Sequence, residues 1–174
     1  MDTLLEILKY TIPSVIVFIT AYFMIKMHLD EQQRIFARAK KTEAMKISLP
    51  IRLQAYERLT LVCDRASIPN TLLRVRGGGM RIADLKGALM LAVSQEFDHN
   101  SSQQLYVSET LWQIILLAKA NTLKLITDAA EGLDPNAPDD AYVDRLFELL
   151  NAQEGANALQ TALVAIRTEA SQIF

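Results

Sequence analysis

Glu96 and His99 come closest, by residue type and spacing, to a known catalytic or metal-binding pattern. They stand three positions apart in a segment with helical periodicity, which places a carboxylate and an imidazole on one helical face. Di-iron bundles use this Glu-x-x-His pair twice, with further glutamates from other helices. This chain has one copy, one further histidine (His28) and one cysteine. We therefore predict no metal and no cofactor, and keep a metal- or ligand-dependent membrane sensor or enzyme centred on Glu96 and His99 as an alternative.

Glu96 is also anomalous because it falls on the apolar side of its expected helix. Burying a carboxylate is costly unless the group is paired or hydrogen-bonded. Arg52 lies in the same way on the apolar side of an earlier helix. We predict that both are buried structural residues and that Glu96 meets Arg52 or the backbone amides of the loop after it. Serines and threonines occur without a matching histidine and acid, so nucleophilic catalysis has no support and a non-enzymatic protein is expected.

A run of three glycines between two arginines marks either a flexible connector or an anion site. The run is Arg76, Gly77, Gly78 and Gly79, with Arg81 shortly after it. Backbone amides ahead of a helix start can form a nest for an anion. The phosphate-loop pattern, however, needs a Lys followed by Ser or Thr at the helix start, and Lys86 is followed by glycine. We expect a flexible connector that can touch an anion or a partner.

The longest uncharged run covers the sixteen residues from Tyr10 to Ile25. Lys9 and Lys26 stand just outside it, about 26 Å apart on a helix, close to the roughly 30 Å of a bilayer core. This pattern predicts a single transmembrane anchor. A secretory signal peptide is a weaker alternative, because the chain starts with the acidic sequence MDTLLE. A hydrophobic helix buried within a protein complex is the other.

Basic residues predict the orientation of this anchor. Six of them lie between Lys26 and Lys46, against Lys9 and the terminal amine on the other side. The positive-inside rule then puts the N-terminus outside and the C-terminal domain in the cytoplasm, at the inner membrane. The lone Cys63 agrees, since no disulfide framework is available. Contact with lipid headgroups is expected for Lys9, Lys26, Arg34, Arg38, Lys40 and Lys41. A polybasic regulator that binds anionic lipid is a further alternative.

The expected fold class is all-α. A membrane anchor (1–29) continues into a helical stalk (30–48), followed by a helical bundle of about four to five helices (49–174). Ser48, Leu49 and Pro50 are predicted to end the stalk and start a new helix. Apolar periodicity predicts bundle helices over 51–66, 82–97 and 109–131, one beginning near Pro138, and one after a break at Gly155. Residues 105–107 are expected to be extended, and Ser108 is expected to cap the next helix.

Three segments carry a family resemblance: LPIRLQAYERLTL (49–61), EFDHNSSQQLYVS (96–108) and WQIILLAKANTLKLI (112–126). Together with the N-terminal anchor, they resemble an uncharacterised family of small membrane-anchored helical proteins from Bacteroidota. The resemblance covers nearly the whole chain. It implies an inner-membrane protein with a cytoplasmic helical domain, and it brings no activity and no catalytic residues.

These observations favour a non-catalytic adaptor or accessory subunit of a larger inner-membrane complex. The expected partners are membrane lipid and one or more proteins, and a homo-oligomer is compatible with the sequence. The net charge of −2 argues against a nucleic-acid-binding protein. A tether would raise the effective concentration of the bundle near its partners. The expected contact surfaces are the stalk, the loop over 98–104 and an exposed part of the fourth or fifth bundle helix.

Overall fold

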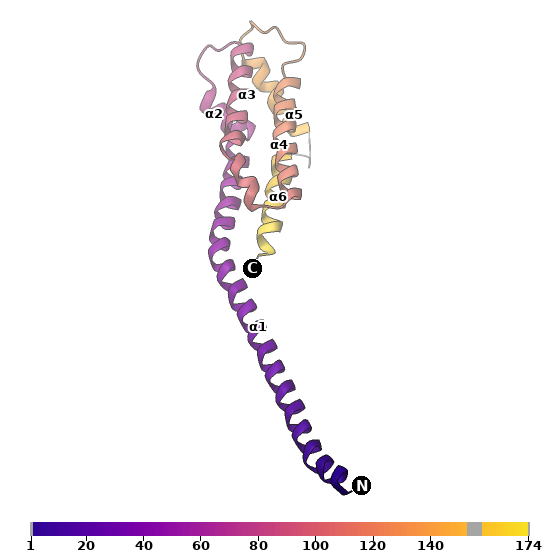
Figure 1. Ribbon diagram of the computed structural model, residues 1–174. Coiled ribbons are helices and arrows are strands. Elements are labelled where there is room, and N and C mark those ends of the chain that lie inside the picture. Colours follow the sequence, from indigo (N-terminus) through magenta and orange to yellow (C-terminus); the bar gives the residue numbers. More distant parts are fainter. Residues whose placement is uncertain (1, 153–157, 174) are drawn as a thin grey trace. The chain divides into compact units, whose positions relative to one another are not determined.

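The computed structural model describes residues 2–152 and 158–173, and for residues 2–14, 41 and 44 it describes the backbone alone. The described chain is helical (Figure 1), and its one β contact is an isolated bridge between Arg81 and Pro138. The prediction of an all-α protein is therefore confirmed. The helices are α1 (Asp2–Arg65), α2 (Ile68–Val75), α3 (Ile82–His99), the 3-10 helix η1 (Ser101–Tyr106), α4 (Glu109–Asp128), α5 (Asp140–Ala152) and α6 (Ala158–Ser171).

The chain forms two compact units, Met1–Ser48 and Leu49–Phe174. Helix α1 nevertheless runs through this boundary without a break, so the predicted helix end at Ser48, Leu49 and Pro50 is wrong. Proline removes a single backbone donor, the one that would bond to the carbonyl of Lys46. The residues on both sides are good helix formers, and the helix continues across the missing bond.

The predicted membrane-spanning anchor over residues 1–29, with its uncharged run at 10–25, is contradicted. Within the described part of the chain, no helix combines the length and the apolar character needed to cross a membrane. The side chains of residues 10–14 lie outside the described residues, and those of the stretch 15–25 are uncharged. Lys26, Asp30 and Glu31 follow it within the same helix.

Helix α4 is the centre of the second unit, as its apolar sequence predicts. It packs against α3, α5 and α6, and Ile115, Ala118 and Ile126 on it are almost fully buried. Its N-terminus is capped by Ser108, whose hydroxyl oxygen accepts a hydrogen bond from the Leu111 amide. The C-terminal part of α1 joins the same core through Tyr56, Leu59, Val62 and Cys63.

Two loop predictions have different outcomes. The segment predicted as extended over 105–107 belongs in part to η1, because the polar run before it closes into a 3-10 turn against the end of α3. The break predicted at Gly155 lies outside the described residues. Helix α6 begins at Ala158 and buries Leu159, Ala162 and Ile166, which are on its predicted apolar face.

Candidate functional site: an arginine-lined groove

An open groove of about 710 Å³ runs along the surface of the second unit. Its walls are the C-terminal part of α1, the end of α2 and the C-terminal half of α3. The α1 residues that line it recur at helical spacing, so they form one stripe along that helix. The lining residues are Gln54, Glu57, Arg58, Leu61, Arg65, Arg74, Val75, Ala92, Gln95, Glu96, His99 and Asn100.

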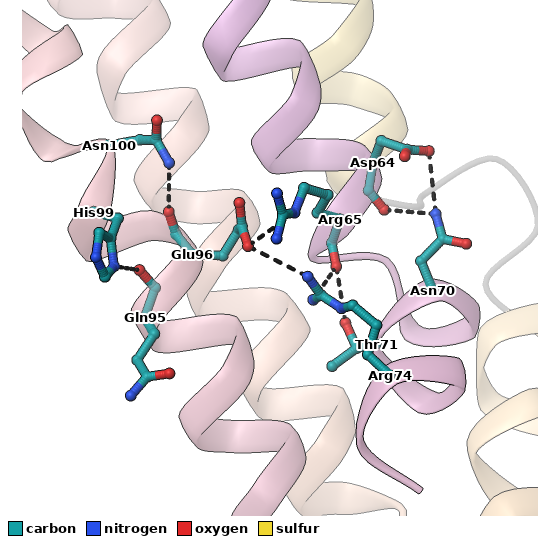
Figure 2. A network of polar contacts seen from close by, with 9 residues as sticks. All are labelled: Asp64, Arg65, Asn70, Thr71, Arg74, Gln95, Glu96, His99 and Asn100. Carbon is teal, nitrogen blue, oxygen red and sulfur yellow. Dashed lines mark hydrogen bonds and ion pairs between the residues drawn. The ribbon is translucent and has the colours of Figure 1, made fainter.

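Glu96 lies in this groove and pairs with two arginines. Its Oε2 is 3.2 Å from Arg65 Nε and 3.4 Å from Arg74 Nη1. Figure 2 marks both contacts with dashed lines. The Glu96 side chain is 15% exposed, whereas those of Arg65 and Arg74 are 56% and 36% exposed. The partners of the Glu96 carboxylate are therefore Arg65 and Arg74 rather than the predicted Arg52 or the backbone amides of the following loop. One shared carboxylate holds the two guanidinium groups side by side.

The same cluster completes the C-terminal end of α1. The carbonyl of Arg65 accepts hydrogen bonds from Arg74 Nη2 at 2.7 Å and from Thr71 Oγ1 at 3.1 Å. The Asn70 amide donates to the Asp64 carbonyl at 3.0 Å. The last carbonyls of a helix have no partner within the helix, and positive charge near them is favourable. Glu96 thereby ties α3 to the junction between α1 and α2.

His99 lines the same groove but does not contact the Glu96 carboxylate. Its ring is exposed, with Nδ1 3.2 Å from the Gln95 carbonyl, and it points away from that carboxylate (Figure 2). No group of three His, Cys, Asp or Glu side chains that could hold a metal ion occurs among the described residues. The Glu-x-x-His spacing therefore brings the pair onto one helix without forming a ligand set. Tyr106 contributes its backbone carbonyl to another cluster.

Arg52 belongs to a separate cluster at the end of α6. Its Nε donates to the Tyr106 carbonyl at 3.1 Å, and its Nη2 donates to the Tyr56 hydroxyl at 2.9 Å. The Tyr56 hydroxyl in turn donates to Glu169 Oε1 at 2.9 Å. Burial and this bond to Glu169 raise the pKa of Tyr56 above its ordinary value. The arginine side chain remains 40% exposed, so Arg52 is a surface-edge residue that fixes α1 to α6.

The glycine-rich loop is held at both ends. Arg76 Nε donates to Asp139 Oδ2 at 2.7 Å, and Arg76 Nη2 bonds Asp140 Oδ1 at 2.7 Å. The hydrogen bonds from Arg76 lower the pKa of Asp139, against the opposing effect of its burial. At the start of α3, the amides of Ile82 and Ala83 donate to the carbonyls of Ala137 and Pro135. Those amides already have protein acceptors, which weakens the expectation of an anion site here.

The predicted headgroup-contacting residues belong to the first unit. Lys26, Arg34, Arg38 and Lys40 are exposed on α1. The side chains of Lys9 and Lys41 lie outside the described residues. Next to Lys26, large apolar side chains are exposed by 48% to 76%; these are Val15, Ile16, Val17, Phe18, Ile19, Tyr22, Phe23, Met24, Ile25, Met27 and Leu29. We call the uncharged part of this stretch, residues 15–25, the apolar segment.

Sequence reasoning missed the arginine pair and the groove around it. Arg65 and Arg74 stand near helix ends, where basic residues are common, and nothing in their spacing links them to Glu96. The one available signal was the position of Glu96 on an inner helical face, which required cationic or amide partners. Arg76 was noted as part of the glycine run, but its bond to Asp139 joins residues 63 positions apart.

A comparison with protein families gives a match over nearly the whole chain. The model of a family of unknown function, DUF7935, matches residues 2–173. No curated protein matches the chain, and no solved structure does. The expectation of an uncharacterised family that covers nearly the whole chain is confirmed at that level. The chain belongs to DUF7935, a family of unknown function.

Proposed function

We propose that this chain is a non-catalytic adaptor that binds a lipid bilayer through the apolar segment of α1 and binds a partner protein through its helical second unit. The observation that carries the proposal is the exposure of this segment. Five consecutive apolar residues, Val15 to Ile19, are each between 48% and 73% exposed. Apolar side chains in such density are found on surfaces that bind another apolar phase.

Lipid fits this segment better than a second copy of the chain. Successive helical residues are turned by about 100°, so five consecutive apolar residues cover the whole circumference. A coiled-coil partner would cover only one stripe of the helix, which contains two of every seven residues. A helix that is apolar all round is buried in lipid or in the centre of a large protein core. Insertion of the segment into one leaflet would cover every side of it.

The basic residues that follow the apolar segment also support binding to a lipid bilayer. Arg34, Arg38 and Lys40 follow the apolar segment on the same helix and are exposed. Anionic headgroups attract basic residues placed beside an apolar membrane-binding helix. The location at a bacterial inner membrane, and an origin in Bacteroidota, remain part of this proposal.

Flotation with lipid vesicles tests the attachment. The full chain is mixed with phosphatidylcholine vesicles, with or without added phosphatidylglycerol, and the floating fraction is measured. Burying one large apolar side chain contributes about 1.5–3 kcal/mol, so Phe18→Asp or Met24→Asp should weaken binding about tenfold or more. Leu73→Asp is the matched control, because Leu73 is 85% exposed but lies on α2 in the second unit.

The outcomes separate the proposal from its alternatives. Flotation with phosphatidylcholine alone that is lost in Phe18→Asp and kept in Leu73→Asp supports insertion of the apolar segment. Flotation that requires phosphatidylglycerol and ignores Phe18→Asp would instead support the polybasic regulator and overturn this proposal. An equal loss of flotation in Phe18→Asp, Met24→Asp and Leu73→Asp would show that any exposed apolar residue contributes to vesicle binding. That result would also overturn the proposal.

The adaptor half of the proposal requires a protein partner. Crosslinking of the full chain in membranes of its own cells, followed by mass spectrometry, should join residues of the second unit to another protein. A chain that crosslinks to nothing and runs as a monomer after extraction would contradict the adaptor role while leaving membrane binding intact.

A further inference from the structure

We propose that the arginine-lined groove of the second unit binds an acidic, carboxylate-bearing segment of the partner protein. This inference deepens the proposed adaptor role by naming the surface and the chemistry of its partner. The groove is lined by Arg58, Arg65 and Arg74 against Glu57 and Glu96, so it has an excess of one positive charge before His99 is considered.

The hydrogen-bonding capacity of the arginines is only partly used. Arg65 reaches Glu96 through Nε, and the described structure gives no partner to its two terminal nitrogens, which carry four N–H groups. Arg74 uses Nη1 for Glu96 and Nη2 for the Arg65 carbonyl. Arg58 is exposed and has no bonded partner among the described residues. Free donors on charged groups are therefore concentrated along one wall.

Glu96 organises two of these arginines in advance. It is mostly buried, it belongs to α3, and it holds one guanidinium from α1 and one from α2. A single carboxylate cannot satisfy two guanidinium groups, each of which can bind a carboxylate through two parallel N–H bonds. A second carboxylate from outside would complete the arrangement. Binding of this second carboxylate would cost less side-chain entropy, because Arg65 and Arg74 are already held in position by Glu96.

The spacing of the lining residues indicates a polypeptide rather than a small anion. Arg58, Leu61 and Arg65 occupy one stripe of α1, with an exposed leucine between two arginines. Val75 and Ala92 add apolar surface beside them. A partner segment with acidic residues on both sides of an apolar residue would match this order of arginine, leucine and arginine. Nucleic acid fits less well, since Glu57 and Glu96 would face its phosphates and the lining residues include no Phe, Tyr or Trp for stacking.

Fluorescence anisotropy with short labelled peptides tests the proposal on the full chain bound to phosphatidylcholine vesicles. The probe is Glu-Glu-Leu-Glu-Glu, and Gln-Gln-Leu-Gln-Gln is its neutral counterpart. Arg58→Glu should weaken binding of the acidic probe about tenfold or more, because opposite charge is replaced by like charge. Arg167→Glu on α6 makes the same charge change outside the groove and should change the affinity by less than about twofold.

Two further variants keep the test independent of folding. Glu57→Gln removes an exposed acidic group from the groove and should strengthen binding of the acidic probe severalfold. Arg58→Lys keeps the charge but not the two-pronged geometry and should bind at an intermediate level. A general loss of structure could not make Glu57→Gln bind more tightly.

The remaining outcomes overturn the inference. Equal binding of the acidic and neutral peptides, or equal effects of Arg58→Glu and Arg167→Glu, would show that the groove does not recognise carboxylates. Displacement of the probe by inorganic phosphate or oligothymidylate at lower concentration than by unlabelled acidic peptide would assign the groove to phosphates. Every peptide-binding measurement uses protein that is already bound to vesicles. Absence of peptide binding therefore contradicts the acidic-segment site, whereas absence of flotation contradicts the membrane attachment.

Discussion

Glu169 Oε1 accepts a hydrogen bond from the backbone N–H of Ser108 at 2.9 Å, and the Ser108 hydroxyl donates to Glu169 Oε2. The same hydroxyl oxygen accepts from the Leu111 amide and so caps α4. A carboxylate near the first turn of a helix is also favoured by the helix dipole. Through this contact the end of α6 is fixed to the start of α4.

Loss of this carboxylate should make stability depend less on pH. Burial alone would raise the pKa of Glu169, but hydrogen bonds from Ser108 and Tyr56 outweigh it and hold the pKa below its ordinary value of 4.5. A lowered pKa in the folded state means that the stabilisation is complete above the ordinary value and is lost as pH falls through the folded value. Glu169→Gln should therefore lower the free energy of unfolding by about 1–2 kcal/mol at pH 7.

The difference between Glu169→Gln and wild type should shrink toward zero when urea unfolding is repeated below about pH 3. Glu148→Gln, an exposed change on α5, serves as control and should stay close to wild type at every pH. A deficit in Glu169→Gln that is the same at pH 7 and pH 3 would show that the carboxylate's charge is not what stabilises this contact.

Removal of the Glu96 charge should destabilise the second unit. Glu96→Gln keeps the shape of the side chain but leaves Arg65 and Arg74 close together without their shared counter-charge. We expect a loss of about 1 kcal/mol in the free energy of unfolding, limited by the exposure of both arginines. Glu57→Gln is the control from the same groove. Chemical unfolding at low and high salt checks the cause, since the deficit of Glu96→Gln should be smaller at high salt.

Two adjacent glycines in the loop before α3 should respond differently to alanine. Gly79 has φ of +73°, whereas Gly78 does not have a positive φ, and an added Cβ would meet nothing within 4 Å at either position. Gly79→Ala should cost about 1–2 kcal/mol through backbone strain alone. Gly78→Ala should be neutral or stabilising by up to about 1 kcal/mol, since it restricts the unfolded chain. Thermal unfolding of the pair would measure this, and equal melting temperatures would contradict the assigned loop conformation.

The single thiol should be unreactive in the folded protein. Cys63 is 1% exposed, and its burial raises the pKa of the thiol to about 12. The thiolate is the reactive form, so labelling with a maleimide at pH 7 should be negligible without denaturant and complete in guanidinium chloride. Rapid labelling of the native protein would mean that the packing of α1 on the core opens readily.

Local signals predicted much of the second unit. The apolar period and the Ser108 cap located α4, although the helix ends at Asp128 and a turn continues to Gly132, whose φ is +75°. Pro50 misled the prediction because proline usually marks a helix boundary, and here it costs a helical hydrogen bond within a continuous helix. The extended segment predicted over 105–107 was wrong for Leu105 and Tyr106, which lie in η1, because short apolar triplets carry no reliable period.

The candidate site was less predictable, because its partners are set by tertiary contacts. Glu96 was identified from its place on an inner face, yet its partners come from the end of α1 and from α2, and neither can be deduced from spacing. The same limit applies to Arg52, whose partners Tyr106 and Glu169 lie far along the chain. Sequence reasoning thus found the unusual charges but could not pair them.

The apolar segment can be probed directly because Cys63 is buried and leaves an introduced cysteine as the reactive thiol. Met24→Cys, at a position 76% exposed, would be labelled with an environment-sensitive fluorophore and mixed with phosphatidylcholine vesicles. Leu73→Cys would be labelled as the control. The proposal predicts a blue-shifted, brighter emission at position 24 that lipid-borne quenchers suppress, with no change at position 73. Emission at position 24 that stays that of a water-exposed probe in the presence of vesicles would contradict attachment through α1.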